Sequence, residues 1–372
     1  MSVERRLDEV IDRFLDSGKV TGTVVLAYQH GEPLFRRAAG LADREAGKPV
    51  EFDTIFRLAS VTKPIVAATA LAMFDDGLMA LSDRVADHLP WFRPKTKDGG
   101  AADITVHQLL THTSGLTYDL ALELLPADQA INCGLLNTDL DYEGNFSRHN
   151  AVPLAFPPGT QWAYSFATDI LGAVIAKVQG GTLEEAVVAH IADSLGMADT
   201  RFHVTDTERL AVPYADATPA PVRMTDPYFA AEDTGWTVGF SPSRIFNGRA
   251  FQSGGAGMAG TADDILIFLE ALRTGGKGVL KPETVRAGLS NRIGALVSDP
   301  GCGFGYFGAV VETPSEALTP QSAGTVRWGG VYGHNWFIDP AKGLTVLSMT
   351  NNALEGCTGE FPDRIVKAVY GA

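Results

Sequence analysis

The chain is poor in cysteine and has no long apolar run. Its three cysteines, Cys133, Cys302 and Cys357, are odd in number and share no short spacing. This pattern predicts neither a disulfide framework nor a zinc site, so we expect three free thiols in a reducing compartment. No stretch reaches the roughly 18 uncharged apolar residues of a membrane-spanning helix.

The chain also has fewer basic than acidic residues. The sequence has 30 Lys and Arg residues against 44 Asp and Glu residues, a formal net charge of −14. Because such a field repels phosphate backbones and anionic lipids, neither nucleic acid nor a membrane surface is an expected partner. Residues 3–15 place apolar side chains at helical spacing among charged ones, without the unbroken apolar core of an export signal. We therefore expect a cytoplasmic protein.

Two common catalytic motifs are missing. The sequence contains no Gly-x-Ser-x-Gly, the nucleophile elbow of α/β-hydrolases, and no zinc-binding His-Glu-x-x-His. A Gly-x-Gly-x-x-Gly does occur at residues 255–260, but no buried strand precedes it and no βαβ pattern surrounds it. We interpret it as a turn before the next helix, and we expect no metal and no cofactor.

Strand patterns cluster at the two ends of the chain. Residues 22–28 and 33–40 flank His30-Gly31, which predicts a hairpin. A helix is expected over about 361–370, after further strand-like runs at 303–311, 325–328, 335–339 and 344–349.

Helical patterns dominate the middle of the chain, at 64–74, 105–111, 168–178, 183–195 and 263–272. Thr182 with Glu185 predicts a capping box, and Thr261 with Asp264 predicts a weaker variant. Two irregular stretches, 117–160 and 204–255, interrupt the helices, and the proline-rich second one is expected to form a wall or lid of a site.

These patterns predict a mixed α+β fold, with an antiparallel sheet built from both termini, flanked by helices and interrupted by a mostly helical insertion. We expect residues 1–372 to form a single unit, with a sheet region of 1–59 and about 295–372 and a helical region of about 60–294. A sheet edge would then meet the helices at a cleft, where ligand sites often lie.

The strongest local motif is Ser60-x-x-Lys63, at the start of an alanine-rich helix. Residues i and i+3 share a helical face, and Pro64 is tolerated only in a first turn, which places the helix start near Ser60. The positive end of a helix favours a serine alkoxide, and a neighbouring lysine could accept the proton. By itself, the motif also fits an N-cap serine beside a solvated lysine.

Two further segments accompany this motif. Residues 161–166 (Gln-Trp-Ala-Tyr-Ser-Phe) lead into a helix. Residues 327–334 (Arg-Trp-Gly-Gly-Val-Tyr-Gly-His) form a glycine-rich strand, which lets a ligand or another chain approach the backbone. Taken singly, the tyrosine also fits helix packing and the glycines a bulge.

In this order, the three segments resemble the serine β-lactamase and penicillin-binding-protein superfamily, with its Ser-x-x-Lys, middle Tyr or Ser motif and glycine-rich strand at the Lys-Thr-Gly position. Residues 109–116 (Leu-Leu-Thr-His-Thr-Ser-Gly-Leu) look like a structural turn of the class C and esterase branch. The chain is similar nearly end to end to family VIII carboxylesterases, including residues 41–47, 221–224, 253–258 and 328–334. This resemblance implies a β-lactamase/transpeptidase-like fold.

Position by position, the resemblance implies Ser60 as the nucleophile and Lys63 as its proton acceptor or the tuner of the base. It implies Tyr164 as general base and then acid, and the backbone N–H groups of Ser60 and Val331 as the oxyanion hole. Substrate contacts are expected from Trp328, Gly329, Gly330, Phe166, Tyr118 and His334.

Two departures from the lactamase pattern favour esters. Trp328 stands in place of the lysine of Lys-Thr-Gly, and Ser165-Phe166 follows Tyr164 where class C lactamases have Tyr-x-Asn. The lysine and asparagine usually contact the carboxylate and amides of penicillins and cell-wall peptides. Apolar replacements suit a neutral acyl ester, so we predict a serine carboxylesterase acting on small short-chain esters through acyl-Ser60.

Alternatives stay open. A β-lactamase, D-aminopeptidase, DD-peptidase or acyltransferase would use the same nucleophile on another acyl donor, and a non-catalytic sensor would stay acylated. His112 is expected to tie a turn together and His334 to line the pocket, rather than to act as bases. An apolar acyl pocket is expected to draw on further aromatic residues: Trp162, Trp236, Phe246, Phe251, Tyr332 and Trp336. The oligomeric state is not predicted.

Overall fold

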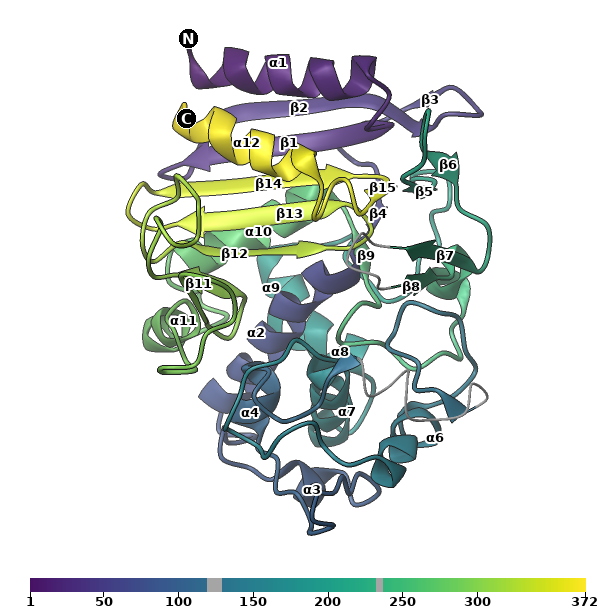
Figure 1. Ribbon diagram of the computed structural model, residues 1–372, viewed down its shortest axis with the longest axis vertical. Coiled ribbons are helices and arrows are strands. Elements are labelled where there is room, and N and C mark those ends of the chain that lie inside the picture. The colour runs from purple at the N-terminus through teal and green to yellow at the C-terminus, as the bar shows by residue number, and fades with distance from the viewer. Residues whose placement is uncertain (119–128, 232–236) are drawn as a thin grey trace.

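A computed structural model describes residues 1–118, 129–231 and 237–372 (Figure 1). Within these ranges the main sheet has eight strands in the order β10-β11-β12-β13-β14-β1-β2-β3, all antiparallel to their neighbours. The strands are β1 (Gly22–Gln29), β2 (Glu32–Asp43), β3 (Lys48–Pro49), β10 (Cys302–Phe304), β11 (Ala309–Val311), β12 (Val326–Gly330), β13 (His334–Asp339) and β14 (Leu344–Thr350).

The two ends of the chain meet in the middle of this sheet. Strand β1 pairs with β14 from Thr23↔Thr350 to Gln29↔Leu344. On its other side β1 pairs with β2 through the predicted hairpin, whose turn residues His30 and Gly31 have φ of 53° and 88°. An antiparallel sheet built from both termini is therefore confirmed, whereas the single unit over 1–372 and the bounds of its two regions stay a prediction.

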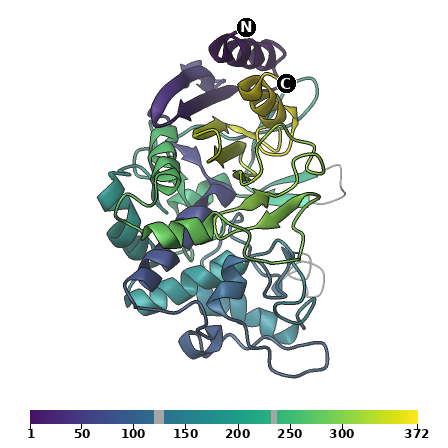
Figure 2. The same cartoon turned by 90° about the vertical axis from the view of Figure 1, so that its left-hand side faces the viewer.

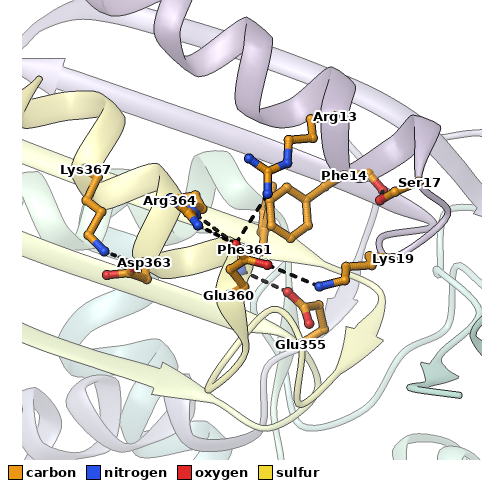
Figure 3. Close-up of polar contacts among 10 residues, drawn as sticks. All are labelled: Arg13, Phe14, Ser17, Lys19, Glu355, Glu360, Phe361, Asp363, Arg364 and Lys367. Carbon is orange, nitrogen blue, oxygen red and sulfur yellow. Dashed lines mark hydrogen bonds and ion pairs between the residues drawn. The ribbon is translucent and has the colours of Figure 1, made fainter. Parts of the chain in front are cut away.

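Helices α1 (Val3–Asp16) and α12 (Glu360–Tyr370) cover one face of the sheet. The rings of Phe14 and Phe361 meet edge to face, with centroids 5.2 Å apart (Figure 3). Glu360 receives hydrogen bonds from Lys19 at 3.2 Å and from Arg364 at 2.7 Å, but exposed ion pairs of this kind contribute little. The buried apolar side chains therefore hold α12, and with it the turn at residues 355–359, against the sheet.

The other face of the sheet packs against α2 (Thr62–Asp75) and α10 (Ala262–Arg273). Nearly all of α2 is buried, from Thr62 to Met73, which suits a helix that is apolar on every side. Helices α3, α4, α6 and α7 lie at the end of the molecule away from α1, and the turned view shows the same separation (Figure 2).

The remaining helical elements carry the rest of the insertion. They are η1 (Ala59–Val61), α3 (Val85–His88), α4 (Val106–Leu110), α6 (Tyr142–Phe146), η3 (Ser147–Ala151), α7 (Ala167–Gln179), α8 (Leu183–Val187), η4 (Val188–Ala192), α9 (Asp193–Leu195), η5 (Pro242–Phe246) and α11 (Pro282–Gly288). None of the described helices is both long and apolar enough to cross a membrane.

The two capping predictions have different outcomes. Thr182 and Glu185 form a complete capping box at the start of α8. Thr261 accepts the N–H of Asp264 at 3.3 Å, but the Asp264 carboxylate accepts instead from the Asp199 N–H at 2.8 Å. The second box is therefore half formed, because a distant loop binds its carboxylate.

The irregular stretch 204–255 holds short paired strands that local patterns do not predict. Strands β7 (Tyr228–Ala231) and β8 (Thr237–Phe240) form a hairpin, and β5 (Tyr214–Ala215) pairs with β6 (Val222–Arg223) and β15 (Asn352–Ala353). Further along the chain, β9 (Ala259–Gly260) pairs with β4 (Phe56–Arg57) just before η1. Cys133, Cys302 and Cys357 are all described, and none of them takes part in a disulfide.

Candidate active site

Ser60 lies in a tight turn at the entrance to α2. The turn is the 3₁₀ element η1, closed by a hydrogen bond from the Val61 N–H to the Leu58 carbonyl at 3.1 Å. Ala59, fully buried, has a φ of 45°, a left-handed conformation that costs a residue with a Cβ some strain. Pro64 occupies the first turn of α2, where its missing N–H is tolerated.

Lys63 lies directly beside the serine. Its Nζ donates to Ser60 Oγ at 3.1 Å and to the Gly255 carbonyl at 2.8 Å. Only 6% of the residue is exposed, and Nζ lies 4.8 Å from the centre of the Tyr164 ring. Lys63 Nζ is thus buried and held beside the serine hydroxyl by a backbone carbonyl.

Tyr164 approaches Ser60 from the loop before α7, and its hydroxyl lies 2.7 Å from Ser60 Oγ. Three rings pack edge to face around the tyrosine ring, those of His112, Tyr118 and Trp328, at centroid distances of 5.1, 5.2 and 5.0 Å. The position of the tyrosine hydroxyl is therefore set by aromatic packing on several sides.

His112 holds the loop that carries Tyr164. Its Nδ1 lies 3.1 Å from Ser165 Oγ, and its carbonyl accepts the Ala163 N–H at 3.0 Å. Burial, together with the charge of Lys63, lowers the pKa of His112 to about 3, so its imidazole is neutral at neutral pH. These contacts tie the turn together, as expected. The side-chain hydrogen bonds of Ser60 Oγ are made with Lys63 and Tyr164 instead.

Strand β12 passes close to the serine turn because it carries glycine there. A Cβ on Gly330 would lie 2.3 Å from the Leu58 carbonyl oxygen and 3.3 Å from the Val61 nitrogen. No side chain fits in that space, so only glycine lets β12 approach η1. The next residue, Val331, lines the same cleft as Ser60.

A cleft of about 750 Å³ opens at Ser60. The expected site residues that line it are Ser60, Tyr164, Trp328, Gly329 and Val331. Trp328 forms its wall beside Tyr164 and also contacts Phe304, with ring centroids 5.3 Å apart.

Four expected substrate contacts do not line this cleft. Phe166 is fully buried and stacks on Phe146 in the core, with centroids 5.6 Å apart. Tyr118 lies behind Tyr164, and Gly330 faces Leu58. His334 is fully buried with its Nε2 2.7 Å from the Arg57 carbonyl, so the expectation that it lines the pocket is corrected: the ring packs in the interior.

Three of the further aromatic residues expected in the acyl pocket pack in the interior instead, namely Phe251, Trp336 and Tyr332. Phe251 and Trp336 belong to the main core, and Tyr332 packs on Phe240. Phe246 is 42% exposed, and Trp236 lies outside the described residues. Trp162 contacts Phe304 at a centroid distance of 5.5 Å, at the back of the wall that Trp328 forms.

A scan against protein-family models matches the beta-lactamase family over residues 7–364. The chain belongs to this family. It is 48% identical over 377 residues to Esterase EstB of Burkholderia gladioli, a match that covers 99% of this chain and 95% of that protein. It is also 28% identical to a lovastatin esterase of Penicillium rubens, over 91% of this chain and 90% of that protein.

A solved structure agrees with the fold. EstCE1, described as a hydrolase with promiscuous acyltransferase activity, superimposes with a TM-score of 0.93 at 39% identity, covering 99% of this chain and 98% of that one. The predicted α+β class, the β-lactamase/transpeptidase-like fold and the resemblance to family VIII esterases are therefore confirmed.

One residue of this beta-lactamase-family site was not anticipated from the sequence. Asp169 is fully buried, and its Oδ1 accepts the Gly255 N–H at 3.1 Å and the hydroxyl of Ser253. Burial raises the pKa of the Asp169 carboxyl above its ordinary value. Because the Gly255 carbonyl accepts a hydrogen bond from Lys63, the Asp169 carboxyl is linked to Ser60 through the backbone of Gly255 and the Lys63 side chain. In the sequence, Asp169 is marked only by its position five residues after Tyr164. That spacing does not predict the contact with residues 253–255, which depends on the tertiary fold.

Proposed function

We propose that this protein is a serine carboxylesterase that hydrolyses short-chain acyl esters through a covalent acyl-Ser60 intermediate. Its family, with an esterase as a near-full-length relative, makes it a serine hydrolase of the esterase type. The observation that carries the proposal is the placement of Ser60 Oγ within hydrogen-bond distance of both Lys63 Nζ, at 3.1 Å, and the Tyr164 hydroxyl, at 2.7 Å.

In the acylation step, Ser60 Oγ attacks the ester carbonyl while the Lys63 and Tyr164 pair accepts its proton. The N–H groups of Ser60 and Val331 hold the negative charge that develops on the carbonyl oxygen. The tetrahedral intermediate collapses with cleavage of the C–O bond, and the same pair returns the proton to the departing alcohol.

In the deacylation step, a water molecule takes the place of the alcohol. Tyr164 removes a proton from this water as it attacks the acyl carbon, and Ser60 recovers the proton when the acid leaves. Water can reach the acyl-Ser60 through the open cleft of about 750 Å³, so no separate channel is needed.

The preference for esters is inferred from Trp328. An aromatic ring at this position offers no cation to a penicillin or peptide carboxylate, whereas it packs well against a neutral acyl group. Phe166, which the sequence suggested for the same role, is fully buried and makes no such contribution. The preference for esters over β-lactams therefore rests on Trp328 alone.

The test is a substrate panel of p-nitrophenyl acetate and butyrate, nitrocefin and a D-Ala-D-Ala peptide, run with the wild-type protein and Ser60→Ala. We expect ester turnover in the wild type and none above background in the variant. Wild-type turnover by Ser60→Ala would refute the nucleophile, and faster cleavage of nitrocefin or peptide would refute the esterase assignment.

Two further outcomes address the open alternatives. EstCE1 is described as having promiscuous acyltransferase activity, so an added alcohol tests for transfer by this chain. Predominant ester synthesis in dilute alcohol would make the protein an acyltransferase. Intact-mass analysis after brief exposure to excess ester would reveal a sensor as a persistent acyl adduct without turnover.

A further inference from the structure

The cleft is much larger than a short-chain ester requires. Its volume of about 750 Å³ falls in the range of roughly 300–1,000 Å³ that holds drug-sized ligands. From Ser60 and Tyr164 it continues past Trp328 to Asp299, Thr319, Gln321, Arg327 and Asn335. If the acyl part is short, as proposed above, the remaining space is available to the alcohol part of the ester.

Two side chains in this distant part of the cleft are hydrogen-bonded to each other. Arg327 immediately precedes Trp328 in β12, and its Nη1 donates to Gln321 Oε1 at 3.0 Å. Arg327 lies four positions before Val331, which at about 3.3 Å per residue places it roughly 13 Å from the proposed oxyanion hole.

Gln321 has a buried donor that the described residues do not satisfy, and Arg327 has no carboxylate partner among them. Gln321 is 2% exposed, and its Nε2 has no hydrogen-bond partner in the described part of the chain. Arg327 has no carboxylate within 4.0 Å in residues 1–118, 129–231 and 237–372, and besides Gln321 its guanidinium donates only to the weak acceptor Cys302 Sγ, from Nη2 at 3.7 Å. Arginine and a glutamine amide nitrogen only donate, and a buried donor without an acceptor is costly, so the pair is complementary to an oxygen acceptor.

We propose that Arg327 and Gln321 form a subsite for an acceptor group, a carboxylate or a second carbonyl, on the alcohol part of the ester. This inference rests on the proposed esterase function and adds the substrate class: short-chain acyl esters of alcohols that carry an oxygen acceptor at their far end. The acceptor accepts hydrogen bonds from the Arg327 guanidinium and from Gln321 Nε2 while Ser60 attacks the ester at the other end.

The charges near this subsite bear on which acceptor binds better. Asp299 and Glu316 also line the cleft, and both are exposed. A third carboxylate there, Asp363, is paired with Lys367 at 2.7 Å. Water screens the repulsion that the exposed carboxylates exert on a bound carboxylate more than it screens the attraction of the half-buried guanidinium. Both a free carboxylate and a neutral carbonyl therefore fit the subsite, and the experiment distinguishes them.

The experiment compares three acetate esters of matched chain length: one of an ω-hydroxy fatty acid with a free carboxylate, one of its methyl ester, and one of the plain alkanol. Acetate release gives kcat/KM for each. We expect one or both acceptor-bearing esters to exceed the alkanol ester by about tenfold, through KM, as suits a charge-assisted hydrogen bond at a partly exposed site.

The variants test whether this pair is responsible. Gln321→Glu keeps the shape but replaces the unpartnered donor by an acceptor that neutralises Arg327, and Arg327→Gln removes the guanidinium. In both variants the ratio between acceptor-bearing and plain esters should fall to about one. Arg286→Gln, on the exposed face of α11, makes the same charge change as the second variant and should keep the wild-type ratio.

The outcomes separate this inference from the esterase proposal. Failure of the wild type to hydrolyse even the plain acetate would refute the proposed function itself. Turnover of all three esters at equal kcat/KM would refute the subsite alone. A preference that survives in both Arg327→Gln and Gln321→Glu would also refute it.

Discussion

The close approach of β12 to the serine turn gives a sharp prediction. In Gly330→Ala, the new methyl group would meet the Leu58 carbonyl oxygen at 2.3 Å and Val61 Cγ2 at 3.2 Å. Ordinary contacts between such atoms are about 3.5 Å, so the strand and the turn must separate by about 1 Å. Both contacts flank Ser60, and backbone in a buried turn cannot move away as a flexible side chain can.

The separation acts on the proposed oxyanion hole. Val331 follows residue 330 directly, so a shift of about 1 Å in β12 moves its N–H away from the developing oxyanion, which typically costs about 100-fold in rate. The overpacking itself should destabilise the fold by about 1–3 kcal/mol. We therefore expect kcat/KM for p-nitrophenyl butyrate to fall about 100-fold in a protein that still folds.

Gly248→Ala is the matched control, because a Cβ there would meet no atom within 4 Å and the residue has no positive φ. It should keep wild-type kcat/KM and the wild-type free energy of unfolding in urea. If Gly330→Ala showed the same behaviour as this control, the proposed contact between β12 and the serine turn would be wrong, and with it the assignment of Val331 to the oxyanion hole.

Three further predictions follow from the site and the core. Tyr164→Phe should lower kcat for p-nitrophenyl butyrate by about 100-fold to 10,000-fold with little change in unfolding free energy, and a loss below about tenfold would mean that another group moves the proton. Asp169→Asn keeps the acceptor for the Gly255 N–H but removes the buried carboxylate; we expect a changed pH profile of kcat with KM nearly unchanged, whereas an unaltered profile would make Asp169 purely structural. Burial lowers the pKa of His334 to about 4 from its ordinary 6.5, so the folded state keeps this imidazole neutral and the unfolded chain takes up the proton first. The contribution of neutral His334 to the free energy of unfolding is therefore fully present above about pH 6.5, and about 3 kcal/mol of it is lost as the pH drops to about 4. Urea titrations at several pH values should show a smaller loss of unfolding free energy in His334→Gln. An equal pH dependence in both proteins would contradict the linkage.

The parts of the site that the sequence predicted are those coded by short spacing. Ser60 and Lys63 share a helical face, and Pro64 sets the helix start, so their contact follows from three positions within a five-residue segment. The resemblance to a known family then supplied Tyr164 and Val331. The strands likewise followed from local alternation and from the turn at His30-Gly31.

What could not be predicted depends on contacts between distant segments. Phe166 and Trp328 are both aromatic residues within motifs that the sequence predicts to be catalytic, yet one is fully buried and the other lines the cleft. Which of them meets substrate depends on the packing of Phe146 against Phe166, and Phe146 lies in an irregular stretch with little local pattern. His334 was misplaced for the same reason, because its partner is a carbonyl 277 positions away.

The position of the site also has a consequence for how mutations act. Ser60 and Lys63 lie at the entrance to α2, Tyr164 precedes α7, and Val331 follows a strand whose neighbour β13 connects to β14 and β1. The sheet that holds β12 is completed by the N-terminal hairpin and covered by α1 and α12. Substitutions in the Phe14–Phe361 contact should therefore lower the fraction of folded protein while leaving kcat of the folded molecules unchanged, since they alter the support of β12 and no group that contacts substrate. Gly330 is different, because it belongs to the support and borders the reacting atoms, and a substitution there should change stability and rate together.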